Sequence, residues 1–195
     1  MGEKSEQKRE HILQCAKSVF SQKGFRSVTM KDIVEACEIS RGGLYLYFGS
    51  TEEIFREICL KELEARGEDI TEQLTKESTM AEILMLFLKE QKKVILRKKQ
   101  DISIAAYEYF FASKPEKESE NLLRNQFETE AEVLDKILEE GTLRGEFYCE
   151  DTIATAYHIM YALEGMKICS KVMGITEGKV DRELLYILEG LMIEE

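Results

Sequence analysis

Residues 28–50 read VTMKDIVEACEISRGGLYLYFGS and predict two short helices joined by a tight turn. Thr29 is suited to cap the first helix, with Asp32 three residues later in a variant of the capping box. Ser40 is suited to cap the second helix, which is expected to reach about Phe48. Two helices of this length and spacing are typical of a helix-turn-helix unit. The alternative is an ordinary helical hairpin inside a core, but the outer face of the second helix argues against it.

That outer face is unusual for a surface in contact with water. At about 100° per residue, Leu44 and Phe48 share one face of the helix and are expected to pack inward. The opposite face carries Gly42, Gly43 and Leu46, with Tyr45 and Tyr47 on its flanks. Two residues without side chains beside an exposed leucine favour a backbone that approaches another molecule closely, as in a DNA major groove.

The rest of the chain is predicted to be helical. The chain has 195 residues and a single proline, Pro115, and its charged residues are mixed with apolar residues at helical spacing. A first helix is expected from Ser5 to Lys23, with Gly24 as its C-terminal cap. A fourth helix runs from Thr51 to about Lys76, and five more are predicted at 79–97, 101–112, 115–141, 150–173 and 178–194. The fold class is therefore all-α, with about nine helices.

Composition narrows the possible functions. Residues 1–50 carry eight Lys or Arg and six Asp or Glu, a net +2, whereas the other 145 carry 19 and 32, a net −13. A basic N-terminal segment with an acidic body is compatible with a DNA-binding surface confined to that segment. No apolar run approaches the roughly 20 residues that a membrane helix needs, and no signal peptide is apparent, so a cytoplasmic protein without membrane contact is expected.

The cysteines do not suggest a metal site or a cofactor. The five cysteines include no Cys-x-x-Cys pair, and the chain has only two histidines, so no zinc site and no cofactor are expected. An odd number of cysteines in a cytoplasmic protein favours reduced thiols, most of them small core residues.

The N-terminal residues closely resemble the DNA-binding domain of the tetracycline-repressor (TetR) family. The resemblance is carried by Arg9-x-x-Ile12-Leu13, Gly24-Phe25, Val28-Thr29-Met30-x-Asp32-Ile33 and Ile39-Ser40-Arg41-Gly42-Gly43-Leu44-Tyr45-Leu46-Tyr47-Phe48. Two positions depart from the family pattern: Cys37 stands where glycine is usual, and Thr51 replaces a common lysine. The resemblance implies a helix-turn-helix domain at 5–65, followed at 66–195 by a C-terminal helical bundle that binds a ligand and dimerises.

The resemblance also implies a role for individual residues on double-stranded DNA. Arg41, Gly42, Gly43 and Leu46 are expected to face the bases, and Thr29, Lys31, Ser40, Tyr45 and Tyr47 the phosphates. For either tyrosine, plain surface packing is the alternative. The implied function is a transcriptional regulator, most simply a repressor that a small-molecule effector releases from a palindromic operator.

Two groups of C-terminal residues are candidates, one for binding the effector and the other for forming the dimer. The candidate pocket residues are Tyr107, Phe110, Phe111, Phe127, Tyr157, His158 and Tyr161, which could equally belong to a packed core, with His158 a structural histidine. The candidate homodimer residues are Tyr161, Gly165, Ile168, Leu184, Leu188 and Leu191, because the apolar stripes of the last two helices are wide for a single core. The alternative is that both stripes are buried within a monomer.

Two other classes of function compete with a ligand-responsive repressor. A thiol redox switch is suggested by the five cysteines and by the position of Cys37 inside the predicted DNA-binding unit. An all-helical enzyme is disfavoured because the sequence has no phosphate-binding glycine loop, no Gly-x-Ser-x-Gly motif and no convergent acid, base or metal set.

Overall fold

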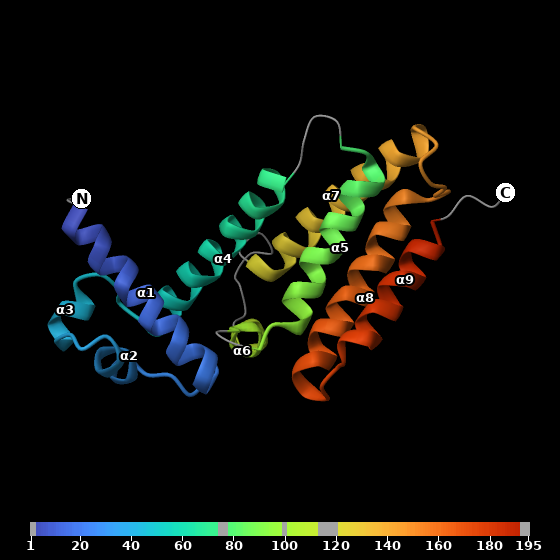
Figure 1. Cartoon of the computed structure of the whole chain (residues 1–195). Helices are drawn as coiled ribbons and strands as arrows, with labels where there is room; N and C mark the ends of the chain where they lie inside the picture. Colours follow the sequence, from blue (N-terminus) through green and yellow to red (C-terminus); the bar gives the residue numbers. More distant parts are fainter. Residues whose placement is uncertain (1–2, 74–77, 99–100, 113–120, 192–195) are drawn as a thin grey trace. The chain divides into compact units, whose positions relative to one another are not determined.

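The architecture is all-helical, as predicted (Figure 1). The computed structural model describes residues 3–73, 78–98, 101–112 and 121–191. Over these ranges the helices are α1 (Glu3–Lys23), α2 (Met30–Ala36), α3 (Arg41–Tyr45), α4 (Thr51–Gln73), α5 (Met80–Leu96), α6 (Ser103–Ala112), α7 (Leu122–Leu143), α8 (Thr152–Val172) and α9 (Glu177–Glu189). No helix in these ranges is long and apolar enough to cross a membrane.

The chain divides into two compact units. The N-terminal unit comprises residues 1–65 and 98–122, and the C-terminal unit comprises residues 66–97 and 123–195. The sequence-based boundary assigned the α6 region to the C-terminal part, whereas the structure packs α6 with the N-terminal unit. The physical reason is burial, because Ile102, Ala105 and Tyr109 complete the apolar core formed by α1 to α4.

The core of the N-terminal unit lies between α1, the two short helices, the start of α4 and α6. The apolar stripe of α1 is buried as its spacing predicts, and Gly24 ends the helix with φ +75°, a conformation that favours glycine. An aromatic cluster of Phe20, Phe25, Phe55 and Tyr109 has neighbouring ring centroids 4.8 to 6.0 Å apart. These rings connect α1, the α1–α2 loop, α4 and α6 within one unit.

Several helices are shorter than the sequence predicted. The helix α3 ends at Tyr45, not near Phe48, because the N–H groups of Tyr47 and Phe48 both donate to the Leu44 carbonyl and close the last turn. The helix α9 ends at Glu189, and α7 begins at Leu122; the predicted start of α7 near residue 115 lies outside the described residues.

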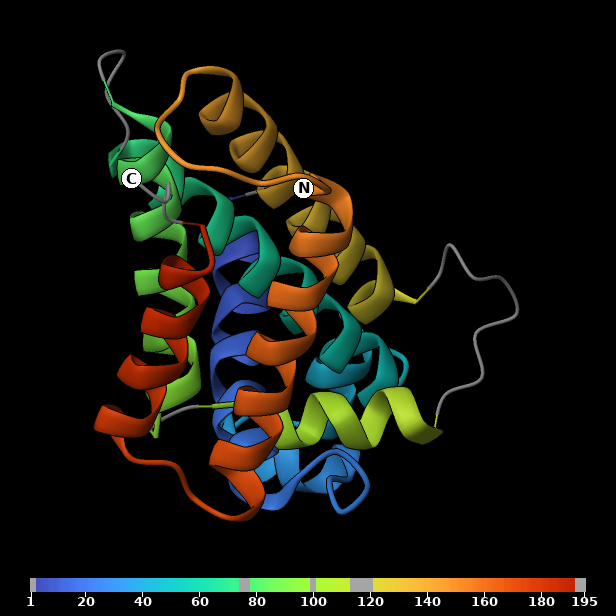
Figure 2. The ribbon, with the colours of Figure 1, turned by 90° about the vertical axis from the view of Figure 1, so that its right-hand side faces the viewer.

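The C-terminal unit is a bundle around a second apolar core. The helices α5, α8 and α9 lie side by side (Figure 2), and α7 adds Ala131, Leu134 and Leu138 to the same core. Gly141 of α7 lies against the ring of Phe147. The loop that carries this ring is also tied to α5, because the Ala81 N–H donates to Glu146 at 2.8 Å.

Candidate nucleic-acid interface

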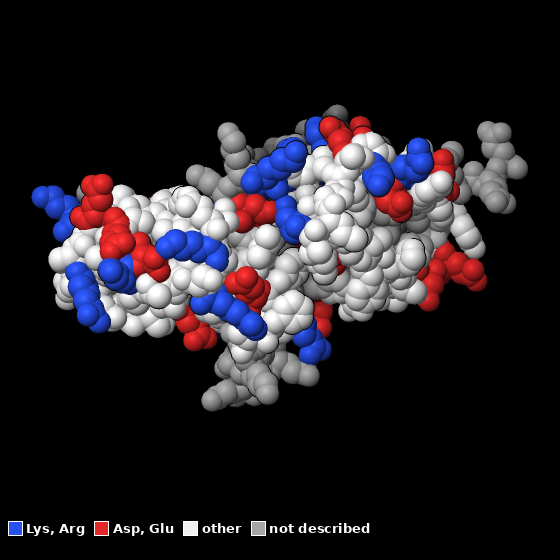
Figure 3. Space-filling view, turned by 90° about the horizontal axis from the view of Figure 1, so that it is seen from below, with Lys and Arg blue, Asp and Glu red and all other residues white. Residues whose placement is uncertain are grey.

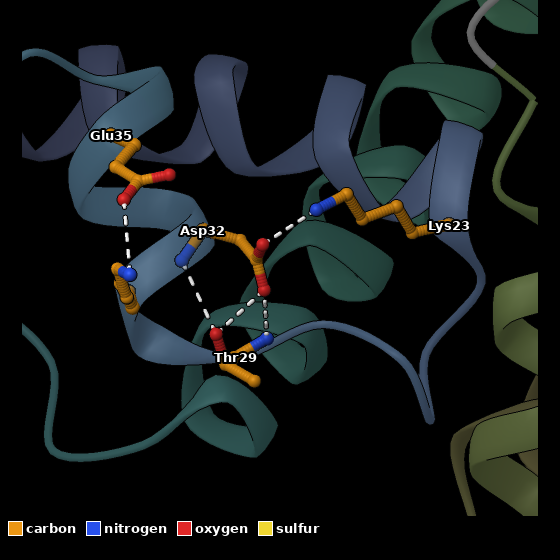
Figure 4. A network of polar contacts seen from close by, with 5 residues as sticks. Lys23, Thr29, Asp32 and Glu35 are labelled. Atoms are coloured by element: carbon orange, nitrogen blue, oxygen red, sulfur yellow. Dashed lines mark hydrogen bonds and ion pairs between the residues drawn. The ribbon is translucent and has the colours of Figure 1, made fainter.

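The start of α2 is fixed by a network of polar contacts that also reaches the end of α1 (Figure 4). The Asp32 N–H donates to Thr29 Oγ1 at 3.3 Å, and the Thr29 N–H donates to Asp32 Oδ2 at 2.8 Å, which completes the capping box. Lys23 Nζ lies 2.5 Å from Asp32 Oδ1. Hydrogen bonds from Lys23 and then from Thr29 hold the pKa of the Asp32 carboxyl well below its usual range. The carboxylate therefore anchors the first helix of the helix-turn-helix to α1.

The turn between α2 and α3 is held from both sides. Cys37 ends α2, its N–H donates to the Ile33 carbonyl at 2.9 Å, and its side chain is buried. Glu38 adopts φ +54°, the left-handed conformation that reverses the chain direction. Ser40 then caps α3, because its hydroxyl accepts the Gly43 N–H at 3.1 Å.

One side of α3 packs into the core and the other is open. Leu44 and Phe48 are fully buried, as their spacing predicts, whereas the Leu46 side chain is 84% exposed. A Cβ atom added to Gly42 would meet no atom within 4 Å, and the backbone there is not in the left-handed region. The chain's own packing therefore does not require glycine at position 42.

The other predicted contact residues surround this open side. Arg41 is exposed and lies over the Tyr45 ring, with its guanidinium carbon 5.6 Å from the ring centroid. Lys31 is exposed on α2 and lies 3.7 Å from Glu35 of the next turn. Tyr47 differs from the rest, because its ring is half-buried against the core.

Acidic and basic side chains share this part of the surface. Seen from below, the N-terminal unit carries lysine and arginine side chains interspersed with acidic ones around a neutral surface (Figure 3). Several of the basic groups are paired within the unit, including Lys23 with Asp32 and Lys17 with Glu62. Contact with a polyanion would therefore rely on a few cations close to α2 and α3.

Comparison with known families agrees with this geometry. A family model described as "Bacterial regulatory proteins, tetR family" matches residues 12–58, and one described as "Tetracyclin repressor-like, C-terminal domain" matches residues 83–181. The chain belongs to the TetR family of transcriptional regulators. The uncharacterised HTH-type transcriptional regulator YfiR of Bacillus subtilis (strain 168) is 32% identical over 153 residues, which cover 78% of this chain and 74% of the relative.

Solved structures share the TetR fold over nearly the whole chain. A transcriptional regulator from Saccharomonospora viridis in complex with choline has a TM-score of 0.82 at 15% identity, covering 96% of this chain and 98% of that one. AibR, in complex with isovaleryl coenzyme A and operator DNA, has a TM-score of 0.68 at 15% identity, covering 91% and 95%. At this identity the likeness concerns the fold, so the TetR architecture extends from the DNA-binding helices through α9.

The candidate pocket residues of this TetR-family chain fall into two groups. Phe127, Tyr157 and Tyr161 come together in the C-terminal unit, with ring centroids 5.2 to 6.2 Å apart. His158, on the same helix, is exposed. The other three candidates, Tyr107, Phe110 and Phe111, belong to α6 in the N-terminal unit, where Phe110 packs against the core and Phe111 is exposed.

The candidate dimer residues are also divided. Tyr161, Gly165 and Ile168 are exposed on α8, whereas Leu184 and Leu191 are buried in this chain's own core and Leu188 packs against it. The exposed apolar residues of α9 are instead Leu185 and Tyr186. One side of α9 therefore packs into the chain's own core, whereas the neighbouring Leu185 and Tyr186 remain exposed.

Two structural residues of the DNA-binding unit were missed by the reasoning from spacing. Arg9 of α1 forms an ion pair with Glu57 of α4, and its guanidinium carbon lies 4.7 Å from the centroid of the Phe48 ring. Glu108 of α6 accepts the Arg26 N–H at 3.1 Å, although the two residues are 82 positions apart. In the sequence, Arg9 stands out only as part of the family motif, and no local signal points to Glu108.

Proposed function

We propose that this TetR-family regulator is a homodimeric repressor that binds a palindromic operator in the cytoplasm and is released by a small-molecule effector. Its role is regulatory, and no catalytic step is assigned to it. The observation that carries the proposal is the open side of α3, where an exposed leucine adjoins a glycine that the fold itself does not need. A bare backbone and an apolar side chain on one helix face suit the floor of a major groove, where a thymine methyl offers apolar contact.

In this proposal some residues around the open side contact the bases and others contact the phosphates. Leu46, Gly42 and Gly43 approach the base edges, and Arg41 lies beside them with its guanidinium held over the Tyr45 ring. Lys31, Ser40, Thr29 and the two tyrosines contact phosphates, which position the helix without reading sequence. Because the Thr29 hydroxyl also serves the α2 cap, its contribution is expected to be smaller than that of Lys31.

Selection from a library of random duplexes, followed by competition binding, tests the operator part. Wild-type protein is expected to enrich two inverted half-sites whose centres are one helical turn apart, or a multiple of it. Leu46→Ala is expected to lose roughly tenfold of the preference at one base-pair position, since one apolar contact to a base is removed. Leu143→Ala, at a leucine that is 76% exposed in the C-terminal unit, is the matched control and should select like the wild type. Equal selectivity of Leu46→Ala and wild type would contradict this placement of α3.

For the effector, the aromatic group of Phe127, Tyr157 and Tyr161 is the proposed contact surface in the C-terminal unit. Three tilted rings offer both apolar area and π faces, which suit an apolar or cationic small molecule. The choline complex and the coenzyme A thioester complex of the structural relatives make choline and isovaleryl coenzyme A the first probes. A probe acting at these rings should release operator from wild-type protein but not from Tyr157→Ala. Equal release from both proteins would place the effector site elsewhere.

The dimer is proposed to form on α8 and α9. Exposed residues of α8 recur at intervals of four and three, which makes one continuous helix face: Ala154, His158, Tyr161, Gly165, Ile168 and Val172. Most of them are apolar or small, and a Cβ atom added to Gly165 would meet nothing within 4 Å in the monomer. A helix face of this kind, beside Leu185 and Tyr186 of α9, is suited to pack on its own copy across a two-fold axis.

A further inference from the structure

Two cysteines that are 22 positions apart in the sequence meet inside the DNA-binding unit. The Cys37 thiol, at the end of α2, donates to the Ile12 carbonyl at 3.9 Å, which lies on α1 only three residues before the half-buried Cys15. The Cys15 thiol is close enough to contribute to the raised pKa of the Cys37 thiol. His11 lies one turn before Cys15, with Nδ1 3.9 Å from Cys15 Sγ and Nε2 3.4 Å from the Cys37 carbonyl oxygen. The imidazole ring therefore contacts the thiol of Cys15 and the backbone carbonyl of Cys37.

The environments of the two thiols differ. Cys37 is buried, and burial together with the neighbouring Cys15 raises the pKa of its thiol to about 12, so it stays protonated. Cys15 is the more accessible of the two and adjoins the imidazole of an exposed histidine. Cys15 Sγ lies 3.7 Å from Nε2 and 3.9 Å from Nδ1 of His11, so in the tautomer whose Nε2–H donates to the Cys37 carbonyl the unprotonated Nδ1 is within reach of the Cys15 thiol proton. The more accessible Cys15 thiol is therefore the one that meets an oxidant first, and Cys37 reacts with it in a second step.

We propose that Cys15 and Cys37 form an intramolecular disulfide when the protein meets a hydroperoxide, and that this bond lowers the affinity for the operator. The formation of the bond is independent of the function proposed above, whereas its effect on affinity rests on it. Cys59, Cys149 and Cys169 take no part.

The chemistry balances with one equivalent of hydroperoxide. His11 accepts the Cys15 proton, and the thiolate attacks the outer peroxide oxygen, which breaks the O–O bond and forms a sulfenic acid on Cys15. The departing oxygen takes the proton back from His11 and leaves as an alcohol, or as water from hydrogen peroxide. The Cys37 sulfur then attacks the sulfenic sulfur, and the Cys37 proton leaves with the hydroxyl group as water. Two thiols lose two electrons in total, and one peroxide bond gains them.

The disulfide acts on the turn that orients α3. A disulfide holds its two sulfur atoms about 2.05 Å apart, much closer than two thiols that are not bonded to each other. Both backbone polar groups of Cys37 are hydrogen-bonded, because its N–H donates to the Ile33 carbonyl and its carbonyl accepts from His11 Nε2. Glu38 follows it in the left-handed conformation, and Ser40 caps α3 two residues later. A shift of Cys37 toward α1 is therefore transmitted to the start of the recognition helix.

The first experiment tests bond formation without DNA. Reduced protein is treated with stoichiometric hydrogen peroxide, and thiols are counted after denaturation. The count is expected to fall from five to three, with a mass loss of two hydrogens and a cross-linked peptide joining Cys15 to Cys37. A variant with Cys59→Ser, Cys149→Ser and Cys169→Ser should lose both of its remaining thiols, whereas Cys15→Ser should form no intramolecular bond. A loss of thiols through other pairs, or no disulfide at all, would overturn the proposal.

The second experiment measures operator binding on the selected duplex. Oxidised wild-type protein is expected to bind at least ten times more weakly than reduced protein, and dithiothreitol should restore binding. Cys15→Ser, which replaces a half-buried thiol with a hydroxyl of similar size, should bind equally with and without peroxide. Equal affinity of the oxidised and reduced wild-type proteins would refute the regulatory part. If the reduced protein selects no duplex at all, the proposed operator function fails, while the disulfide result still stands.

Discussion

At Gly141, in the α7 segment of the C-terminal core, the addition of a single methyl group is predicted to destabilise the fold. A Cβ atom added there would lie 2.1 Å from Cζ of the Phe147 ring, far inside van der Waals contact. Alanine is favoured over glycine in a helix by about 1 kcal/mol, but overpacking a core costs roughly 1–3 kcal/mol, so the overlap is expected to dominate. Gly141→Ala should lower the free energy of unfolding in urea by up to about 2 kcal/mol. Gly178→Ala in α9, where the added atom meets nothing, should leave stability unchanged or slightly higher, and equal effects at both positions would contradict the packing.

At the scale of one element, the α2 cap predicts a pH dependence of stability. The pKa of Asp32 is lower in the folded protein than in the unfolded chain, because Lys23 and Thr29 hydrogen-bond to the carboxylate. The stabilising contribution is therefore fully present above the unfolded pKa of about 3.9 and is lost as the pH falls toward the lower folded value. In urea unfolding, Asp32→Asn should be less stable than wild type at pH 6, and the difference should shrink progressively below about pH 4. Thr29→Ser keeps the hydroxyl of the cap and should track the wild type, whereas a pH-independent deficit in Asp32→Asn would contradict the assignment.

At the scale of the whole molecule, the exposed face of α8 predicts the assembly state. Two recognition helices must reach successive major grooves, about 34–36 Å apart, which one chain cannot do. Wild-type protein should sediment at about twice the 22.6 kDa of the single chain at low micromolar concentration. Ile168→Glu, at a side chain 45% exposed on α8, should shift the population toward monomer and weaken operator binding, because a charge would be buried at the seam. Met85→Glu, 53% exposed on α5, is the control expected to remain dimeric, and a monomeric wild type would refute the two-half-site proposal.

The sequence alone determined the local features of the chain. The all-helical class, the cap at Thr29 and Asp32, the cap at Ser40 and the C-terminal cap at Gly24 were all predicted and are confirmed by the structure. So is the inward packing of Leu44 and Phe48. Such features are encoded within three or four neighbouring residues, because a cap or a helix face depends on backbone geometry that repeats over one turn.

The tertiary structure decided everything that depends on which surfaces meet. Spacing could not show that α6 packs with the N-terminal unit, because its carboxylate at Glu108 meets a backbone N–H 82 positions away. Nor could it show that Leu184 faces the chain's own core while Leu185 is exposed, since α9 carries apolar residues on both sides. The proximity of Cys15 on α1 to Cys37 at the end of α2 likewise depends on how the two helices pack, and their spacing in the sequence does not show it. A helix pattern states which residues share a face, but only the packing of distant helices determines what that face contacts.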